Sequence, residues 1–372
     1  MRDISQLRSM RAAPLSVKIL LTKQRVREWI RQYGEDGVYV SFSGGKDSTV
    51  LLDIVRQDYP DVHAVFVDTG LEYPEIREFV KTFENVDWVK PDKTFKQVIQ
   101  DYGYPVISKQ VSERVFRTQK YLEWYKNKEG REPTDFALKK FLNYDKDEKI
   151  PAEVLDKIIQ TPADQLSELV RDGENSDRFN FSKWFFLCKA PVLIGYRCCD
   201  TMKKRPAHKY TKETGRKPIT AEMAEESLLR TQNWLKHGCN GFDMTSPKST
   251  PMAFWTENDV LQYVKEHDLK IASVYGDVVE EGQFSGQMAL TDLGIDEGRQ
   301  KKYCTTGLHR TGCMFCGFGC HADKPGRGRF ELLKQTHPKV YDYIMRPADK
   351  GGLDFKTLID WINETGGTSI KY

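Results

Sequence analysis

The stretch Phe42–Thr49, FSGGKDST, combines glycines, hydroxyls, a lysine and a carboxylate. A glycine loop that leads into a helix offers backbone N–H groups to phosphate oxygens, and a lysine adds positive charge. The common pattern G-x-x-x-x-G-K-[ST] does not fit, because Val40 replaces its first glycine and Asp47 follows Lys46. Ser48 supplies a hydroxyl, and Asp47 suits a cation such as Mg²⁺ that accompanies pyrophosphate. The loop therefore predicts nucleotide phosphates, bound by a different pattern.

The cysteines form a second group with possible chemistry. Cys198 and Cys199 are adjacent, and Cys313 and Cys316 form a C-x-x-C. Adjacent cysteines suit neither one zinc ion, whose paired ligands are usually about two to four residues apart, nor an unstrained disulfide. A four-iron cluster can take neighbouring thiolates on separate irons. We therefore expect these four residues to bind one [4Fe–4S] cluster.

Two alternatives to the cluster stay open. The four cysteines could be small buried hydrophobic residues, or a zinc ion could bind near the C-x-x-C. The zinc alternative uses Cys313, Cys316, Cys320 and either His321 or Cys304. Cys188 and Cys239 are expected in the core, while Cys304 and Cys320 are either spare ligands or sulfur-handling thiols.

Basic stretches follow both cysteine pairs. Residues 203–217, KKRPAHKYTKETGRK, contain seven Lys or Arg and one acid, Glu213. A second group comprises Lys324, Arg327 and Arg329. Such runs are usually solvated faces, but here they could also offset cluster charge, bind a phosphate-like or sulfate-like group, or contact a nucleic-acid backbone.

The elements around the loop alternate between strand and helix. Residues 16–33 have helical spacing of apolar side chains, and 37–57 change from a β-branched strand through the loop to an apolar helix. A buried strand over 61–70 and a helix over 73–83 follow. This order predicts an α/β fold with a doubly wound, mostly parallel sheet.

Asp68 is expected near the loop, because it follows the second strand and ligands of open α/β sheets collect at the carboxyl ends of strands. There it would orient a metal-bound water or a ribose. The alternative is an aspartate that only caps the turn before Thr69 and Gly70.

The 372-residue chain divides by composition into four parts. We expect a nucleotide-binding part over 1–110, a helical insertion over 111–190, the remaining α/β part with the iron–sulfur ligands over 191–320, and a basic, helical tail over 321–372. The insertion would be a lid, a partner surface or a solvated decoration. A net charge of +3 argues neither for nor against nucleic acid. With no long apolar run and no secretory signal, we expect a cytoplasmic protein without membrane association.

The segment SFSGGKDSTVLL resembles the PP-loop of the ATP pyrophosphatase (adenine nucleotide alpha hydrolase-like) superfamily. VFVDTGLEYPEIREFV, ITAEMAEESLLR, STPMAFWTENDVLQYV and IASVYGD narrow the resemblance to the phosphoadenosine phosphosulfate (PAPS) reductase family. The resemblance implies that ATP or a related adenine nucleotide is bound by ten residues: Ser41, Ser43, Gly44, Gly45, Lys46, Asp47, Ser48, Asp68, Thr69 and Gly70. Lys46, Asp47 and Asp68 would act in catalysis. The cysteine arrangement is similar to the [4Fe–4S] ligands of assimilatory APS reductases, although the spacer is longer.

The sequence also departs from the reductases. Those enzymes use a cysteine in a C-terminal motif, whereas no cysteine follows Cys320 here, and ITAEMAEES lacks an arginine usual in them. Three hypotheses result. The first is ATP cleavage between the α and β phosphates coupled to sulfur transfer, as in relatives that modify nucleic acids. The second is sulfonucleotide reduction, and the third is a non-catalytic nucleotide-binding module of a larger complex. Nucleic acid, a sulfur-donor protein and a second copy of the chain are the expected partners.

Overall fold

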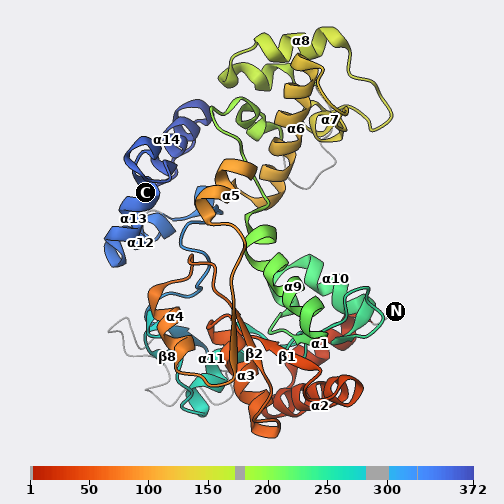
Figure 1. Cartoon of the computed structure of the whole chain (residues 1–372), viewed down its shortest axis with the longest axis vertical. Helices are drawn as coiled ribbons and strands as arrows, with labels where there is room; N and C mark the ends of the chain where they lie inside the picture. Colours follow the sequence, from red (N-terminus) through yellow and green to blue (C-terminus); the bar gives the residue numbers. More distant parts are fainter. Residues whose placement is uncertain (1–2, 172–180, 282–300, 325) are drawn as a thin grey trace, which may run out of the picture. The chain divides into compact units, whose positions relative to one another are not determined.

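The computed structural model describes residues 3–171, 181–281, 301–324 and 326–372. The chain divides into two compact units, each built from two separated stretches (Figure 1). Unit 1 comprises Met1–Asp92 and Lys203–Cys313, and unit 2 comprises Lys93–Met202 and Met314–Tyr372. No helix within the described ranges is both long enough and apolar enough to cross a membrane.

A six-stranded sheet lies at the centre of unit 1 in the described residues, with strand order β3-β2-β1-β5-β7-β6. Its strands are β1 (Val38–Ser41), β2 (Ala64–Val67), β3 (Val86–Val89), β5 (Lys217–Ile219), β6 (Asn240–Gly241) and β7 (Lys248–Ser249). All neighbours pair in parallel except β6 and β7, which are antiparallel. The predicted mostly parallel α/β sheet is confirmed, and its order reverses between β1 and β5.

Helices flank this sheet. They are α1 (Ile4–Ala12), α2 (Leu15–Tyr33), α3 (Lys46–Asp58), α4 (Pro74–Lys81), α9 (Arg205–Thr214), α10 (Leu228–His237) and α11 (Glu257–Glu266). The Tyr39 ring of β1 contacts Tyr210 of α9, with ring centroids 5.2 Å apart. Because side chains alternate along a strand, the fully buried Val38 and Val40 face the opposite side. The sheet is therefore covered on both faces. A separate antiparallel pair joins β8 (Val278–Glu280) to β9 (Tyr303–Thr305).

A buried ion pair ties α11 to α2. The Lys18 ammonium lies 2.6 Å from the Asp259 carboxylate, and each side chain is only 1% exposed. Asp259 also accepts hydrogen bonds from the backbone N–H and hydroxyl of Thr256, which caps α11. Removing one partner of such a pair would leave a buried charge uncompensated. The start of α11, and with it Glu257, is therefore held firmly in place.

Unit 2 is mainly helical. Its helices and strands are α5 (Phe95–Tyr102), β4 (Val106–Ile107), α6 (Lys109–Asn127), α7 (Phe136–Leu142), α8 (Ala152–Gln160), η1 (Ala163–Leu169), η2 (Ser182–Lys189), β10 (Gly317–Phe318), α12 (Arg329–Thr336), α13 (Pro338–Met345) and α14 (Phe355–Gly366). The ring of the fully buried Phe355 contacts the rings of Phe95, Tyr104 and Phe330. This aromatic cluster joins the first and last parts of the unit.

The unit boundaries differ from the division expected from composition. The helices over 111–190 and the tail over 321–372 both lie in unit 2, where β10 pairs in parallel with β4 and α14 packs against η2. These pairings join residues far apart in sequence, so no local composition shift marks them.

Candidate functional site

The predicted loop lies between β1 and α3, as the sequence indicated. The hydroxyl oxygens of Ser43 and Ser48 are 3.0 Å apart. The Ser43 N–H donates to the Ser48 hydroxyl at 3.2 Å, and the Gly45 N–H donates to the Ser43 hydroxyl at 3.3 Å. Because Gly45 is the N-cap of α3, these donors cluster at the positive end of a helix. The loop thus has the geometry of an anion cradle.

Gly44 holds the loop close to α4. Its φ of +69° lies in the left-handed region, and a Cβ there would come within 2.7 Å of Val80 Cγ2 and 2.8 Å of Ile76 Cγ2. Any side chain would therefore strain the backbone and collide with two buried residues. The glycine is required by this close approach as well as by the turn.

Lys46 is buried and already balanced by protein groups. Its ammonium donates to the His309 carbonyl at 2.8 Å and lies 2.9 Å from the Glu257 carboxylate. Asp47 is more distant, at 3.9 Å. The Lys46 backbone N–H donates to the Tyr275 hydroxyl at 3.3 Å. A phosphate at the loop would therefore share or replace partners that Lys46 has in this structure.

The two predicted catalytic carboxylates have different surroundings. Burial raises the pKa of Asp47, and its Oδ1 atom is buried without a hydrogen-bond partner among the described residues. Such an orphaned oxygen fits a ligand to Mg²⁺, which proteins often bind through one carboxylate and substrate phosphates. Asp68 follows directly after β2, where it was expected, and pairs with Arg77 at 2.9 Å. It also accepts from the Gly70 N–H at 3.3 Å, which is the turn cap of the alternative interpretation.

Thr69 and Gly70 complete this turn. The Thr69 hydroxyl donates to Glu72 at 2.7 Å, and Gly70 has a φ of +73°. Glu72 in turn lies 3.5 Å from the Lys203 ammonium. The turn after β2 is therefore rigid, and its polar side chains bond mainly to one another.

A cavity of about 620 Å³ opens beside the carboxyl ends of β1 and β2. This volume falls in the range of roughly 300–1,000 Å³ that small-molecule sites occupy. Of the predicted site residues, Ser41 and Ser43 line it. Much of its wall is apolar: Tyr39, Phe42, Val65, Phe66, Val67, Tyr73, Ile76, Ala207, Pro218, Met244 and Pro247. The cavity lies where the sheet order reverses, which is the usual ligand position in open α/β sheets.

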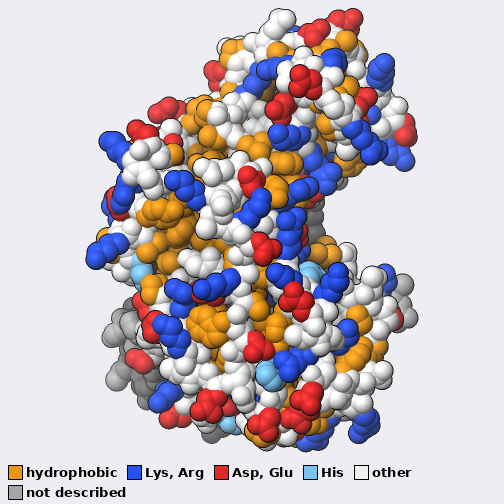
Figure 2. Space-filling view, viewed as in Figure 1, with side chains coloured by type: hydrophobic (Ala, Val, Ile, Leu, Met, Phe, Trp, Pro, Cys, Tyr) orange, Lys and Arg blue, Asp and Glu red, His pale blue; other side chains and the backbone are white. Residues whose placement is uncertain are grey.

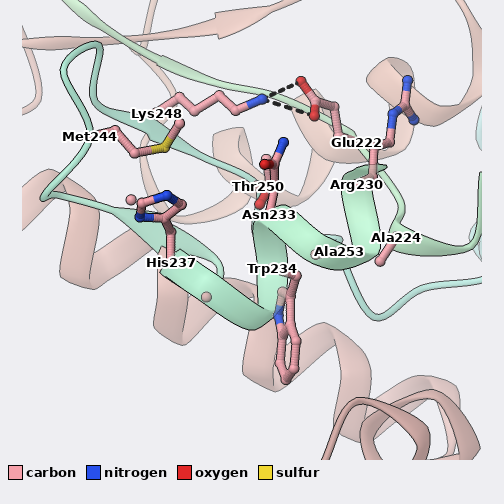
Figure 3. A pocket seen from close by; sticks show the side chains of 12 residues that line it. Glu222, Ala224, Arg230, Asn233, Trp234, His237, Met244, Lys248, Thr250 and Ala253 are labelled. Carbon is pink, nitrogen blue, oxygen red and sulfur yellow. Dashed lines mark hydrogen bonds and ion pairs between the residues drawn. The ribbon is translucent and has the colours of Figure 1, made fainter. Parts of the chain in front are cut away.

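The basic stretch predicted from the sequence contributes to the cavity wall. Five basic residues line it: Lys203, Lys204, His208, Lys217 and Lys248. The Lys248 ammonium pairs with Glu222 at 2.8 Å (Figure 3), whereas His208 and Lys217 have no acidic side-chain partner in the described part of the chain. Charges of both signs are mixed over the face shown in Figure 2. Because Glu72 and Glu222 also line the cavity, its wall carries more basic than acidic side chains but is not uniformly positive.

Sequence reasoning missed the groups that surround Lys46. The sequence patterns predict no role in the site for Glu257, Tyr275, His309 or Thr311. The available signal was weak: Glu257 and Tyr275 lie in WTENDV and IASVYGD, which were used only to identify a family. The proximity of Glu257 to the loop depends on the packing of α11, and that of Tyr275 on the packing of the turn Ser273–Tyr275 before β8.

The candidate metal-binding cysteines are divided between the units, with Cys313 in unit 1 and the others in unit 2. The sulfurs of Cys198 and Cys199 are 3.9 Å apart, well beyond the length of a disulfide bond. Over the described ranges, no group of three or more His, Cys, Asp or Glu side chains is arranged to hold a metal ion. The [4Fe–4S] cluster therefore stays a prediction from the spacing of the cysteines in the sequence.

The remaining cysteines differ in exposure. Cys188 and Cys239 are buried, as predicted. Burial raises the pKa of Cys320 to about 11, which disfavours it as a nucleophile at neutral pH. Cys304, on β9, is partly exposed. Of the two candidate sulfur-handling thiols, Cys304 is therefore the more accessible.

Comparison with known proteins finds a match in the part of the chain that contains the loop. Residues 37–132, which span the loop and the turn after β2, match the family described as "Phosphoadenosine phosphosulfate reductase domain". Adenosine 5'-phosphosulfate reductase from Staphylococcus haemolyticus is 33% identical over 85 residues, covering 21% of this chain and 35% of the relative. The same enzyme from a Geobacillus species is 46% identical over 56 residues, covering 15% and 22%.

The likeness is partial in each case. An uncharacterized protein from Methanocaldococcus jannaschii is 36% identical over 72 residues, which are 18% of both chains. The matched stretches thus span 35% or less of the length of these curated relatives. A crystal structure of PAPS reductase from Candida auris in a phosphate complex covers 78% of this chain and 90% of its own, with a TM-score of 0.35 and 13% identity.

A mostly parallel α/β sheet, with a glycine-lysine loop between its first strand and the following helix, is the arrangement expected of a PP-loop fold. Within that fold, residues 37–132 match the PAPS reductase domain. The resemblance stated from the sequence motifs is confirmed.

Proposed function

We propose that unit 1 binds an adenine nucleotide, with its phosphates on the loop and its base in the adjoining cavity. The observation that carries this proposal is the continuity of the two features, since Ser43 belongs to the loop and also lines the cavity. The apolar wall suits a purine, and the donors at the start of α3 suit its phosphates. The phosphate contacts would come from the predicted residues Ser41, Ser43, Gly44, Gly45, Lys46, Asp47 and Ser48.

The reaction we propose is cleavage of ATP between the α and β phosphates, with adenylation of an acceptor and transfer of sulfur. Lys46 would neutralise phosphate charge, which develops on the pyrophosphate as it leaves. Asp47 would hold Mg²⁺ through its Oδ1 atom, which has no hydrogen-bond partner among the described residues, and the ion would supply positive charge beside the phosphates. Asp68, held by Arg77 and the turn, would orient the ribose or a metal-bound water.

Reduction of a sulfonucleotide is the second candidate. The observation in its favour is that curated relatives matching this domain carry the name adenosine 5'-phosphosulfate reductase. That chemistry requires a thiolate that attacks sulfur, and Cys304 is the partly exposed thiol available for it in unit 1 besides Cys313. The third candidate function is a module that binds a nucleotide without turnover.

Cofactor and partners extend the same proposal. A [4Fe–4S] cluster on Cys198, Cys199, Cys313 and Cys316 would make anaerobic preparations brown, with about four irons per chain. Serine at any of the four should lower the iron content, whereas a colourless protein with one zinc would favour the ligands around Cys320. Nucleic acid or a sulfur-donor protein would supply the acceptor or the sulfur, and a second copy of the chain remains a candidate partner.

One experiment separates the three candidates. Anaerobically purified protein is incubated with Mg²⁺ and either ATP, adenosine 5'-phosphosulfate or PAPS, and pyrophosphate and sulfite are measured in the same samples. Pyrophosphate from ATP supports adenylation, and sulfite from a sulfonucleotide supports reduction. Tight binding without either product supports the module. Absence of binding to all three nucleotides would contradict the proposed site itself.

A further inference from the structure

Two hydroxyl groups outside the loop lie at the start of α3. The Tyr275 and Thr311 oxygens are 2.5 Å apart, so one hydroxyl donates to the other. Tyr275 also accepts from the Lys46 N–H at 3.3 Å. A Cβ placed on Gly45 would lie 3.3 Å from the Tyr275 oxygen and 3.7 Å from the Thr311 oxygen. The pair therefore lies directly over the N-cap of the helix.

The position of the Tyr275 oxygen is the notable feature. A backbone N–H at the first turn of a helix has no partner within the helix, and in a phosphate loop it donates to a phosphate oxygen. Here the tyrosine oxygen receives that N–H of Lys46 and so occupies an acceptor position otherwise open to phosphate. Tyr275 is 2% exposed, while Thr311 lines the cavity. The hydroxyl pair thus extends from the buried side of the loop to the cavity.

We propose that Tyr275 and Thr311 are phosphate-binding residues of this site, whose hydroxyls donate to an oxygen of the nucleotide phosphate that the loop holds. The inference rests on the proposed nucleotide site. A hydroxyl changes from acceptor to donor by rotating its proton, without moving its oxygen. The exchange replaces the neutral hydrogen bond between the two hydroxyls with charge-assisted ones, which are roughly twice as strong, and it leaves the bond from the Lys46 N–H in place. The ligand class is an anionic phosphate or phosphosulfate group.

The chemistry of the pair also predicts selectivity. Neutral hydroxyls add donors without adding charge, beside a lysine whose charge is already balanced by Glu257. They would therefore favour a ligand that brings an oxyanion to the loop, and they would contribute nothing to recognition of the base. The expected signature is a loss of affinity for nucleotides with no change for the nucleoside.

The test measures binding of ATP and of adenosine 5'-phosphosulfate by calorimetry, and binding of adenosine by ligand-observed NMR. Tyr275→Phe and Thr311→Val should each weaken binding of the nucleotide that wild type prefers by about tenfold, the loss expected for a hydrogen bond to a charged group. Adenosine binding should stay unchanged, and Thr311→Ser should restore nucleotide affinity. The two losses should not add fully, because the hydroxyls share one network.

Tyr263→Phe is the matched control. Tyr263 is fully buried in the same unit and also donates to a residue of α3, Asp53 at 2.6 Å, but it lies away from the loop. The Tyr263→Phe substitution should therefore leave the affinity for nucleotides unchanged. Normal nucleotide affinity in both Tyr275→Phe and Thr311→Val, or an equal loss for adenosine, would overturn this inference while leaving the nucleotide site intact. If wild type bound neither nucleotide, the proposed function would fail together with it.

Discussion

The two units obtain their folds in different ways. In unit 1, a parallel sheet is built from short strands, each followed by a turn or helix that the local sequence already specifies. In unit 2, the described strands β4 and β10 pair over only two residues each, and the aromatic cluster around Phe355 joins distant segments. Unit 1 also leaves donors and a cavity for a ligand. The proposed nucleotide binding by unit 1 would therefore depend on local loop geometry, whereas the stability of unit 2 depends on burial of large rings.

The largest expected effect is a loss of stability in unit 2 alone. Phe355→Ala removes a fully buried ring, and such truncations cost about 3–5 kcal/mol of unfolding free energy. Urea unfolding should show this loss, while nucleotide affinity in unit 1 stays near wild type. Phe136→Ala is the control, since Phe136 is a 50% exposed ring of the same unit and should change stability little. Loss of nucleotide binding in Phe355→Ala would show that the two units are not separable in this way.

The second prediction tests whether the close contact between Gly44 and α4 matters for stability. Gly44→Ala should lower the free energy of unfolding by about 2–4 kcal/mol, since left-handed strain and overpacking against α4 add together. Gly215→Ala shares the positive φ, at +75°, but its Cβ would meet nothing within 4 Å. Gly215→Ala should therefore lower the free energy of unfolding by only about 1–2 kcal/mol. Equal losses at the two positions, measured by thermal unfolding, would argue that contact with Val80 and Ile76 is unimportant.

A third prediction concerns the charge balance of Lys46. Lys46→Ala should weaken adenine-nucleotide binding about tenfold or more, because a charge-assisted contact is lost. Glu257→Gln should act in the opposite direction and tighten binding, since the carboxylate at 2.9 Å competes with phosphate for the ammonium. Calorimetry at low and high salt measures the nucleotide affinity of both variants. Unchanged affinity in Lys46→Ala would remove the lysine from the phosphate site.

The smallest effect appears at alkaline pH. Burial, together with the hydrogen bond to Asp87, raises the pKa of Tyr210 from its usual 10.0 to about 12. A pKa that is higher in the folded state stabilises the fold below pH 10, and this contribution disappears as pH rises toward 12. The urea midpoint should therefore fall over that interval, and Tyr210→Phe should flatten the fall. A wild-type curve that matches the variant would contradict the assignment.

Much of unit 1 could be read from the sequence because its signals are local. The β-branched run before FSGGKDST and the apolar run after it predict strand, loop and helix without knowledge of the remaining chain. The position of Asp68 at the end of β2 follows in the same way. The partners of Lys46 were not predictable, because Glu257 and Tyr275 reach it only through packing of α11 and the chain near β9.

Unit 2 was harder to predict, because the contacts that define it are not local. Its helices were predicted from amphipathic spacing, but their membership in one unit was not, because pairing of β4 with β10 has no sequence signal over two residues each. The cysteines show the same limit. Their spacing predicts a cluster, yet spacing alone does not determine which thiols meet.

The interleaved order of the units has a consequence for biosynthesis. Val38 of β1 pairs with Lys217 of β5, so one side of β1 has no partner until the ribosome has made the intervening chain. At typical elongation rates this interval lasts about 10 to 40 s. Meanwhile the nascent protein carries β1, β2 and β3 with an open strand edge, the kind of surface on which chains associate wrongly. Early synthesis is therefore the stage at which a chaperone would matter most for this protein.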